Sequence, residues 1–525
     1  MNTHLKEYRW PLVVSLLILA LSSAPILAGY AAQTPGQRFI GAFSDRQDYA
    51  VYVAMMQYGG QGNWDYEFRF TTEAHIGAYL RTFYVVLGRL TGWTGLSPSL
   101  IFQAARLFFG LLACLAIYHL MTRVFTAIAQ RRLAFVLAIM GAGLGWLQVP
   151  LHLVPNPGIS PIDFWLIDAY VFFDIAVFPH FAAVIAALAL SISIFLDHQQ
   201  NPRWRNIALI AGCALFVQIV NPIAFILADC AMIGAFAFSC WHNRRFDWAS
   251  AFALGLLAVI QIPILAYSLA LLTQDPVWAE YNRQNVTSSP PPIYYLLGFG
   301  LLWPFAVIGA VRALRKPDAS VGWAVVWVLF ALGMAYFPIA IQRRFLLAIG
   351  IPLTALAIPV IVAFSEWLHR RLHLSKLTGA IVIVAFTTLT PLLMVSAYSA
   401  DMAKRPADMF EPAALVQAAD WLNKIGTSEQ VVLAAEPTAQ LIAIRTHLRL
   451  YFGHVMETLY YAEKAQAVEN FYRGKQPAGW LKTQGIDWVI FGPHEKLWGQ
   501  HAPDSPNLQI AFQNELVTIY RVVSP

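Results

Sequence analysis

Residues 10–32 read WPLVVSLLILALSSAPILAGYAA, an apolar run long enough to cross a bilayer. Arg9 precedes this run and small residues end it, so both a cleaved signal peptide and an uncleaved first anchor fit the pattern. Many further apolar runs follow along the chain, and for that reason we expect the anchor. The opening of the sequence therefore predicts that the chain enters a membrane close to its N-terminus.

The composition of the whole chain also indicates a membrane protein. Of its 525 residues, 58% are hydrophobic and 12% are charged, and the mean hydropathy is +0.55. Soluble domains carry about 25% charged residues, and a single soluble core could not bury this much apolar surface. The four cysteines lie in or beside apolar runs without metal-ligand spacing, so we interpret them as small apolar side chains.

Apolar runs of sufficient length predict a polytopic α-helical protein with about eleven transmembrane helices. We place these spans at residues 10–32, 97–122, 133–148, 180–197, 205–221, 222–240, 248–270, 293–311, 320–338, 345–365 and 377–398. Lys and Arg collect before the first span and after alternate spans, whereas residues 148–180 contain neither. The positive-inside rule then places the N-terminus in the cytoplasm and the residues after the last span outside it. The placement of the basic residues, with a net charge of +6, indicates a membrane topology and no nucleic-acid partner.

Two parts of the chain differ from the spans. The first extracytoplasmic loop, about residues 33–96, contains an apolar but basic segment at 76–90, which we interpret as an interfacial helix that does not cross. Three β-rich runs occur in the tail: VVLAA (431–435), WVIFG (488–492) and VTIYRV (517–522). Two amphipathic segments, residues 411–426 and 456–474, accompany these runs, so we predict a transmembrane domain at 1–400 and a small soluble extracytoplasmic α/β domain at 401–525.

The first loop is rich in carboxylates. The stretch SDRQDYAVYVAMMQYGGQGNWDYEFRFTTEAH, residues 44–75, contains five: Asp45, Asp48, Asp65, Glu67 and Glu73. Asp45 and Asp48 are three residues apart and would share one face of a helix. Three interpretations stay open: solvated acids without a task, a divalent-cation site, or a general base at the membrane face. No zinc-type ligand spacing accompanies these acids.

A second polar cluster is predicted on the same side of the membrane. The segment YFPIAIQRRFLLAIGIPL, residues 336–353, places Arg343 and Arg344 in a short turn that faces outward. Two adjacent arginines there break the positive-inside trend. They fit either contact with lipid headgroups or a clamp for a phosphate group, which suits guanidinium geometry.

The loop PIDFWLIDAYVFFDIAVFPH, residues 161–180, adds further candidates on the outer side. Asp168 fits a helix cap and His180 fits an interfacial residue, but both would also fit the lining of the same site. Of the residues in this loop, His180, which follows a proline at the start of a predicted span, is the one that we favour.

These pieces together resemble the GT-C superfamily of integral membrane glycosyltransferases. The acidic loop FSDRQDYAVYVAMMQYG resembles the first extracytoplasmic loop of that family, which carries a catalytic Asp or Glu. The helix GLSPSLIFQAARLFFGLLACLAIYHLMTRVF, with Arg106, resembles the arginine-containing helix that follows it. The segment around Arg343 is similar to a late loop whose arginine meets lipid phosphate in some relatives. This chain has Asp45-Arg-Gln-Asp48 where relatives have an adjacent acidic pair, so either aspartate is a candidate base.

The resemblance implies a transferase of the inner membrane that acts in the cell envelope. It would move a hexosyl or pentosyl group from a polyprenyl-phosphate-linked donor to a lipid, glycan or protein acceptor, by an inverting displacement. Asp45 or Asp48 would be the base, and Arg343 and Arg344 would hold the donor phosphate. The supporting residues would be Glu73, Arg106, Asp168 and His180. No cofactor is implied beyond the divalent cation left open at the acidic loop.

Two alternatives belong to other classes of protein. A lipid or polysaccharide transporter, or flippase, would carry charged or polar residues inside its spans, where Asp229 is the clearest case here. A membrane scaffold would keep the same fold without a base or a phosphate clamp.

Overall fold

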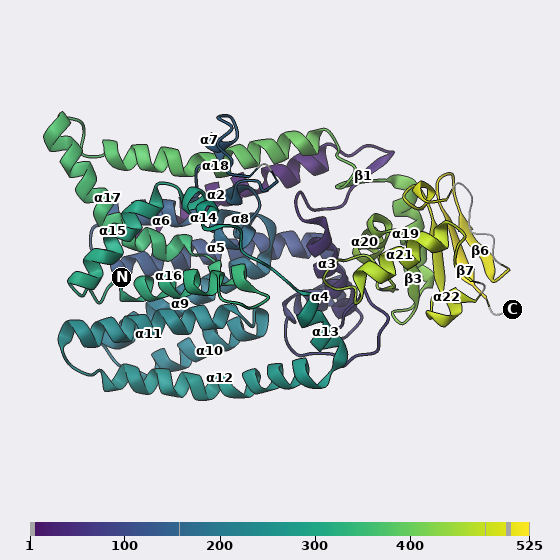
Figure 1. Ribbon diagram of the computed structural model, residues 1–525, viewed down its shortest axis with the longest axis horizontal. Helices are drawn as coiled ribbons and strands as arrows, with labels where there is room; N and C mark the ends of the chain where they lie inside the picture. The colour runs from purple at the N-terminus through teal and green to yellow at the C-terminus, as the bar shows by residue number, and fades with distance from the viewer. Residues whose placement is uncertain (1–5, 157, 478, 500–505, 524–525) are drawn as a thin grey trace. The chain divides into compact units, whose positions relative to one another are not determined.

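The computed structural model divides into two compact units (Figure 1). It describes residues 6–156, 158–477, 479–499 and 506–523. The first unit, here called the membrane unit, comprises Met1–Ala24, Ala105–Tyr267 and Val286–Ala397. The second, here called the loop–tail unit, comprises Pro25–Ala104, Ser268–Asn285 and Tyr398–Pro525. Each unit is described by itself.

Within the described residues, seven helices are long and apolar enough to cross a membrane. They are α2 (Arg9–Ala31), α5 (Pro98–Val124), α9 (Pro179–Gln200), α11 (Ala224–Asn243), α12 (Trp248–Gln274), α17 (Gly350–Leu372) and α18 (Thr378–Ala403). An eighth span is formed if α14 (Pro292–Phe299) and α15 (Leu302–Arg315), which meet at a bend of 96°, count as one broken helix. Two shorter apolar helices are α10 (Trp204–Val220) and α16 (Gly322–Ala335).

The predicted helical membrane fold is confirmed, but the count of eleven spans is not. The span predicted at residues 133–148 is wrong, because helix α6 covers Ile128–Met140 and its 13 residues are too few to cross. The sequence after it, Gly-Ala-Gly at 141–143, leaves the helical conformation. Glycine lowers helix stability by about 1 kcal/mol relative to alanine, so an apolar run alone overstated the helix.

Close backbone contact holds several helix pairs of the membrane unit together. Gly309 of α15 lies so near the backbone of Leu356 in α17 that a methyl group at Gly309 would overlap the Leu356 carbonyl. Gly322 of α16 lies against the side chain of Phe238 in α11, so that a methyl group at Gly322 would overlap that side chain. Helix association in lipid depends on such small residues, because lipid provides little hydrophobic driving force between helices.

Short elements connect the helices of the membrane unit. They are α7 (Gly145–Gln148), η1 (Ile162–Phe164), η2 (Ile167–Ala169), α8 (Val171–Val177) and the 3₁₀ turn η3 (Gln342–Leu346).

The loop–tail unit combines the first loop with the C-terminal part of the chain. Strand β1 (Gln37–Phe39) of the loop pairs antiparallel with β2 (Phe410–Pro412) of the tail. Helix α3 (Arg46–Gly60) packs on α4 (Phe83–Thr94), since Gly59 and Gly88 let the two backbones approach closely. Helix α4 has 12 residues, too few to span a bilayer, so residues 76–90 do not form a crossing helix. Helix α13 (Pro276–Gln284) completes this part.

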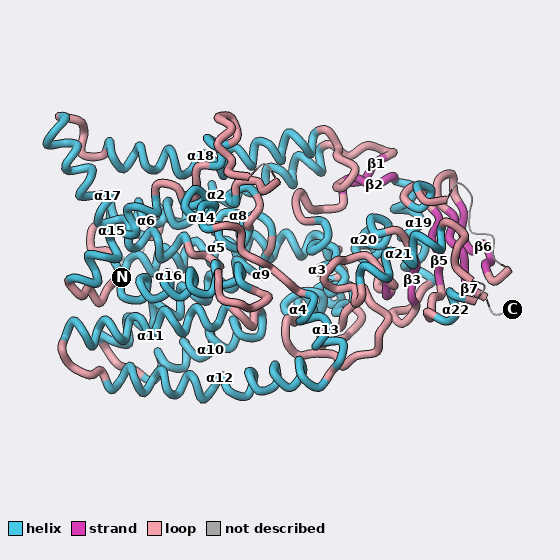
Figure 2. The backbone as a smooth tube through the Cα atoms, viewed as in Figure 1, coloured by secondary structure: helices cyan, strands magenta, loops and turns pink. Residues whose placement is uncertain are grey.

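The tail folds around a five-stranded mixed sheet with strand order β4-β3-β5-β7-β6, drawn as magenta strands in Figure 2. The strands are β3 (Val431–Leu433), β4 (Arg449–Leu450), β5 (Trp488–Phe491), β6 (Leu508–Gln513) and β7 (Thr518–Val522). The helices are α19 (Ala413–Ile425), α20 (Glu436–Arg445), α21 (Tyr461–Tyr472) and α22 (Trp480–Thr483), and η4 covers Glu495–Leu497. The predicted small α/β region at the C-terminal end is confirmed.

Candidate functional site

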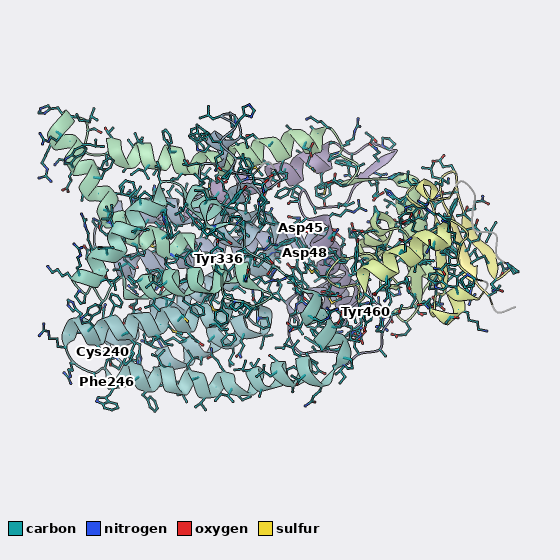
Figure 3. The ribbon with its side chains drawn as sticks, viewed as in Figure 1. Asp45, Asp48, Cys240, Phe246, Tyr336 and Tyr460 are labelled. Carbon is teal, nitrogen blue, oxygen red and sulfur yellow. The ribbon has the colours of Figure 1, made fainter. Side chains whose placement is uncertain are left out.

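Asp45 and Asp48 lie together at the start of α3 (Figure 3). Asp45 is the N-cap of this helix, in a left-handed conformation with φ of 47°, and its Oδ1 accepts a hydrogen bond of 3.2 Å from the backbone N–H of Asp48. An N-cap aspartate satisfies a backbone donor that the helix leaves without an intrahelical partner. Asp45 therefore has a structural task that the spacing of the sequence did not reveal.

Asp48 meets a histidine from the tail. The Nε2 atom of His454 lies 3.2 Å from Asp48 Oδ1, while the histidine side chain is 4% exposed and that of Asp48 is 42% exposed. The His454 Nδ1 atom accepts backbone N–H bonds from Met456 and Glu457, each 3.0 Å long. The remaining ring proton is therefore on Nε2, from which His454 donates to Asp48.

The charge state of His454 is subject to opposing effects. Burial lowers the pKa of the ring and the Asp48 carboxylate raises it, with a net rise above the ordinary value. A second proton would, however, place an N–H at Nδ1 against the two backbone N–H donors already there. The contacts of Nδ1 thus favour the neutral ring, which holds Asp48 through one directed hydrogen bond.

The other acids of the first loop have partners within the loop–tail unit. Glu73 forms an ion pair of 2.8 Å with Lys464 of α21. Burial is the largest single effect and raises the pKa of Glu73, but the charge of Lys464 and the hydrogen bonds from Lys464 and Thr71 together lower that pKa by more, so the carboxylate stays charged. Glu67 lies 3.4 Å from Arg69, and Asp65 accepts a hydrogen bond of 3.4 Å from the Tyr58 hydroxyl.

A buried ion pair ties the first turn of α3 to the tail. The Arg46 guanidinium contacts the Glu411 carboxylate and also donates to the carbonyls of Asp408, at 2.8 Å, and Pro437, at 2.6 Å. Arg46 and Glu411 are almost completely buried. A buried pair of this kind costs several kcal/mol if one partner is removed, so it fixes the residues that follow it, including Asp48.

A second cluster supports the segment that carries His454. Arg81 donates to the Tyr281 hydroxyl at 2.5 Å and lies over the rings of Tyr66 and Tyr281. Its guanidinium is 3.6 Å from Glu457, which also accepts a hydrogen bond of 2.6 Å from the Tyr66 hydroxyl. Since Glu457 is three residues after His454, this cluster holds the histidine loop in place.

Arg343 and Arg344 lie in η3 of the membrane unit, and both are half-buried. The Arg343 guanidinium is 5.1 Å from the centre of the Trp165 ring, over which it stacks. Within the described part of the chain, Arg343 forms no ion pair with a carboxylate. A stacked guanidinium keeps its N–H edge directed away from the ring face, which suits an anionic oxygen.

The remaining supporting residues also belong to the membrane unit. The backbone carbonyl of Asp168 in η2 accepts a hydrogen bond of 2.8 Å from the backbone N–H of Ala348, which follows η3. His180 is in the first turn of α9 and stacks beside Phe181. Arg106 of α5 donates to the hydroxyls of Ser22, at 3.0 Å, and Ser23, at 2.8 Å, in α2. These bonds between two spans explain why an arginine is tolerated there.

No group of three or more His, Cys, Asp and Glu residues in the described ranges is arranged to hold a metal ion. The divalent cation at the first loop therefore stays a prediction that no contact in the structure supports.

The sequence interpretation missed His454, Arg46 and Glu411. His454 lies in YFGHVMETL, residues 451–459, and nothing in that local pattern points to a carboxylate 406 positions earlier. The only local signal was a histidine directly after Gly453, in a tail that was otherwise interpreted as strands and helices.

Comparison with protein-family models and with curated protein sequences gives no match. Solved structures do match. The crystal structure of ArnT from Cupriavidus metallidurans bound to undecaprenyl phosphate has a TM-score of 0.51 at 12% identity, over 97% of this chain and 99% of that one. The cryo-EM structure of the arabinofuranosyltransferase AftD from Mycobacteria has a TM-score of 0.55 at 15% identity. This match covers 98% of the present chain and 40% of AftD.

At these identities the likeness concerns the fold. Two membrane glycosyltransferases match this chain along nearly its whole length, and the chain carries several helices that can cross a membrane. The predicted GT-C-like fold is thus confirmed: this chain is a helical membrane protein whose fold resembles those of ArnT and AftD.

Proposed function

We propose that the protein is a glycosyltransferase that uses a polyprenyl-phosphate-linked sugar and transfers it on the extracytoplasmic side of the inner membrane. The observation that carries this proposal is the Asp48–His454 pair. It joins a 42% exposed carboxylate to a buried neutral histidine, an arrangement that orients a general base toward solvent or substrate. The fold shared with ArnT and AftD supports the same class of reaction.

The reaction is a single inverting displacement. The oxygen of an acceptor hydroxyl attacks the anomeric carbon, and the bond from that carbon to the phosphate oxygen breaks. Asp48 takes the proton of the hydroxyl, and polyprenyl phosphate leaves. Of the two aspartates, Asp48 is the better candidate, because the Asp45 carboxylate accepts the N-cap hydrogen bond of α3.

Arg343 and Arg344 are proposed to bind the donor phosphate. The support is the stacked guanidinium of Arg343, which forms no ion pair among the described residues. ArnT was solved with undecaprenyl phosphate, which supports a lipid of this class as the donor carrier. Glu73, which pairs with Lys464, and Arg106, which bonds to two serines, are proposed as structural supports; Asp168 and His180 keep the supporting roles assigned from the sequence.

The orientation is proposed from charge. Basic residues such as Lys6 and Arg9 precede the first span, so the N-terminus is assigned to the cytoplasm and residues 401–525 to the extracytoplasmic side. The transferred sugar is a hexose or pentose, and the acceptor is a lipid, glycan or protein of the cell envelope.

The transporter alternative rests on polar residues inside the spans. Asp229 of α11 accepts a hydrogen bond of 3.3 Å from Gln261 of α12, whose carbonyl accepts one of 3.2 Å from Gln218 of α10. These bonds link three neighbouring helices, which is a common structural use of polar side chains in membranes. They do not require a transport pathway.

A transfer assay in proteoliposomes separates these functions. The purified chain receives lipid-linked sugar donors and an envelope extract as acceptor, and free polyprenyl phosphate is measured by mass spectrometry. We expect release with the wild type and its loss in Asp48→Asn alone and in Asp45→Asn/Asp48→Asn together. Movement of the intact donor between leaflets without release would instead establish a transporter, and unchanged release in both variants would exclude the proposed base.

A further inference from the structure

The C-terminal part of the loop–tail unit contains a pocket that none of the roles above use. Its volume is about 340 Å³, within the range of about 300–1,000 Å³ typical of small-ligand sites. All of its lining residues come from the tail, between Ala435 and Trp498. It is therefore a property of one unit and of the folded tail.

Aromatic rings form one part of the pocket wall. Phe452, Tyr461 and Trp498 line it, and the rings of Phe452 and Tyr461 lie 5.0 Å apart at an angle of 32°. Phe452 is buried, whereas Tyr461 and Trp498 are half-buried and retain accessible ring surface. Such rings offer flat apolar faces at low conformational cost, against which the C–H face of a sugar packs.

Hydrogen-bonding groups form the rest. Glu436, Glu469 and His494 line the pocket, and its lining, all within the described residues, contains no Lys or Arg. Glu469 forms an ion pair of 2.7 Å with Arg473, which is outside the lining, and Glu436 accepts hydrogen bonds from Gln47 and from the Tyr461 hydroxyl. Carboxylates in a lining without Lys or Arg favour ligands that donate hydrogen bonds, such as hydroxyl groups, over a phosphate or another anion. The pocket thus does not fit the phosphate end of the donor.

The pocket wall is bonded to the helix turn that carries Asp48. Gln47 donates to Glu436 Oε1 at 2.7 Å, and Arg46 donates to the Pro437 carbonyl at 2.6 Å. Glu411, the partner of Arg46, lies 3.4 Å from His494. Glu436 and Pro437 are therefore bonded directly to the two residues that precede Asp48, and His494 is connected to Arg46 through Glu411.

The pocket is also linked to His454, the histidine that bonds to Asp48. Phe452 is two residues before His454, and Gln440 bridges Glu436 to the Gly453 carbonyl through hydrogen bonds of 3.2 and 3.0 Å. A ligand that orders this wall would therefore act on the segment that positions Asp48.

We infer that this pocket is a subsite for an uncharged sugar unit of the acceptor, held by aromatic stacking and by hydrogen bonds from its hydroxyls to Glu436 and Glu469. The identification of the bound sugar as part of the acceptor rests on the proposed function. Sugar binding at this pocket does not depend on the proposed function, and it is measured without any donor.

The test is direct binding to the full-length chain in lipid nanodiscs, followed by saturation-transfer NMR. The probes are the methyl glycosides of glucose, galactose, mannose, N-acetylglucosamine and arabinofuranose, with tetramethylammonium as a cationic probe. We expect saturation transfer to at least one glycoside, and a dissociation constant at least fivefold higher in Glu436→Gln and in Trp498→Ala. Glu463→Gln is the matched control, since Glu463 is an exposed acid of α21 that does not line the pocket.

Several outcomes decide between the possibilities. Binding only of tetramethylammonium would overturn the inference in favour of a cation pocket. Glycoside binding that is the same in all variants, or no glycoside binding by folded wild-type protein, would also overturn it. Folding of each variant is checked by its melting temperature, because Glu436 also accepts hydrogen bonds from Gln47 and from the Tyr461 hydroxyl. If glycosides bind here while no sugar transfer occurs in the assay above, the subsite stands and the proposed transferase function fails.

Discussion

The strongest test of the proposed base compares three single variants at the start of α3 and in its tail partner. A general base contributes about 10²–10⁴-fold to a rate, so Asp48→Asn should lower kcat by that factor. Asp45→Asn should leave kcat within about twofold, because asparagine caps a helix about as well as aspartate. The two substitutions make the same chemical change three residues apart, and only the role of the carboxylate differs.

His454→Asn isolates the hydrogen bond to Asp48. The asparagine carbonyl can still accept the backbone N–H groups of Met456 and Glu457, but the shorter side chain cannot reach Asp48. A hydrogen bond to a charged group contributes about 1.5–3 kcal/mol when buried. Since the Asp48 side chain is 42% exposed, solvent screening reduces this to about 1 kcal/mol, which corresponds to about fivefold in kcat.

The assay measures initial rates of polyprenyl phosphate release in nanodiscs at saturating donor, with the melting temperature of each variant as the folding control. His454→Ala, which also leaves two backbone N–H groups unpaired, should lose more stability than His454→Asn. Equal loss of rate in Asp45→Asn and Asp48→Asn would refute the ranking of the two acids. An unchanged kcat in a folded His454→Asn would remove the positioning role of the histidine.

Three further predictions concern other parts of the molecule. Arg343→Ala should weaken binding of undecaprenyl phosphate about tenfold, as measured by native mass spectrometry. Arg312→Ala, in the last turn of α15, is the control. An equal loss of binding in both variants would mean that the lipid responds only to the positive charge of the protein. Gly88→Val should destabilise the contact of α3 with α4 by about 1–3 kcal/mol or more, because a Cβ at Gly88 would overlap the Met56 carbonyl. Gly36→Val, which has open space, should change the melting temperature little, and a normal melting temperature for Gly88→Val would contradict the packing. The Glu73 pKa lies below its ordinary value of about 4.3, so the stability from the Glu73–Lys464 pair is present above that pH and is lost as the pH falls through the lowered pKa. Glu73→Gln should therefore be destabilising at pH 7, and this effect should shrink in thermal unfolding as the pH is lowered below about 4, while the exposed Glu463→Gln should show no such dependence.

The membrane architecture could be predicted from the sequence because bilayer thickness imposes a length on apolar runs. The helices α2, α9 and α12 begin within one residue of the predicted spans. The predicted span is wrong at α6, where Gly141 and Gly143 follow the early end of the helix. The predicted span at 293–311 is interrupted by the bend between α14 and α15, where Gly300 adopts a positive φ of 50°. Apolar content alone carries no information about either break.

The candidate site was only partly predictable, for a related reason. The local pattern identified the acids near Asp48 and the arginines near Arg343, because such residues are unusual beside apolar spans. It could not rank Asp45 against Asp48. That ranking depends on an N-cap conformation and on His454, more than 400 positions away in the chain.

The fusion of loop and tail into one unit gives the ranking its physical basis. A loop held only by its flanking spans would let Asp48 sample many orientations. The rate of sugar transfer would then fall, because few of these orientations place the carboxylate correctly for reaction. Here β1 pairs with β2, Arg46 is buried against Glu411, and His454 reaches Asp48. Each of these contacts comes from the tail, so under the proposed function the tail positions the base even if it never touches the donor. Loosening the tail at Glu411 should therefore lower kcat more than it raises KM for the donor.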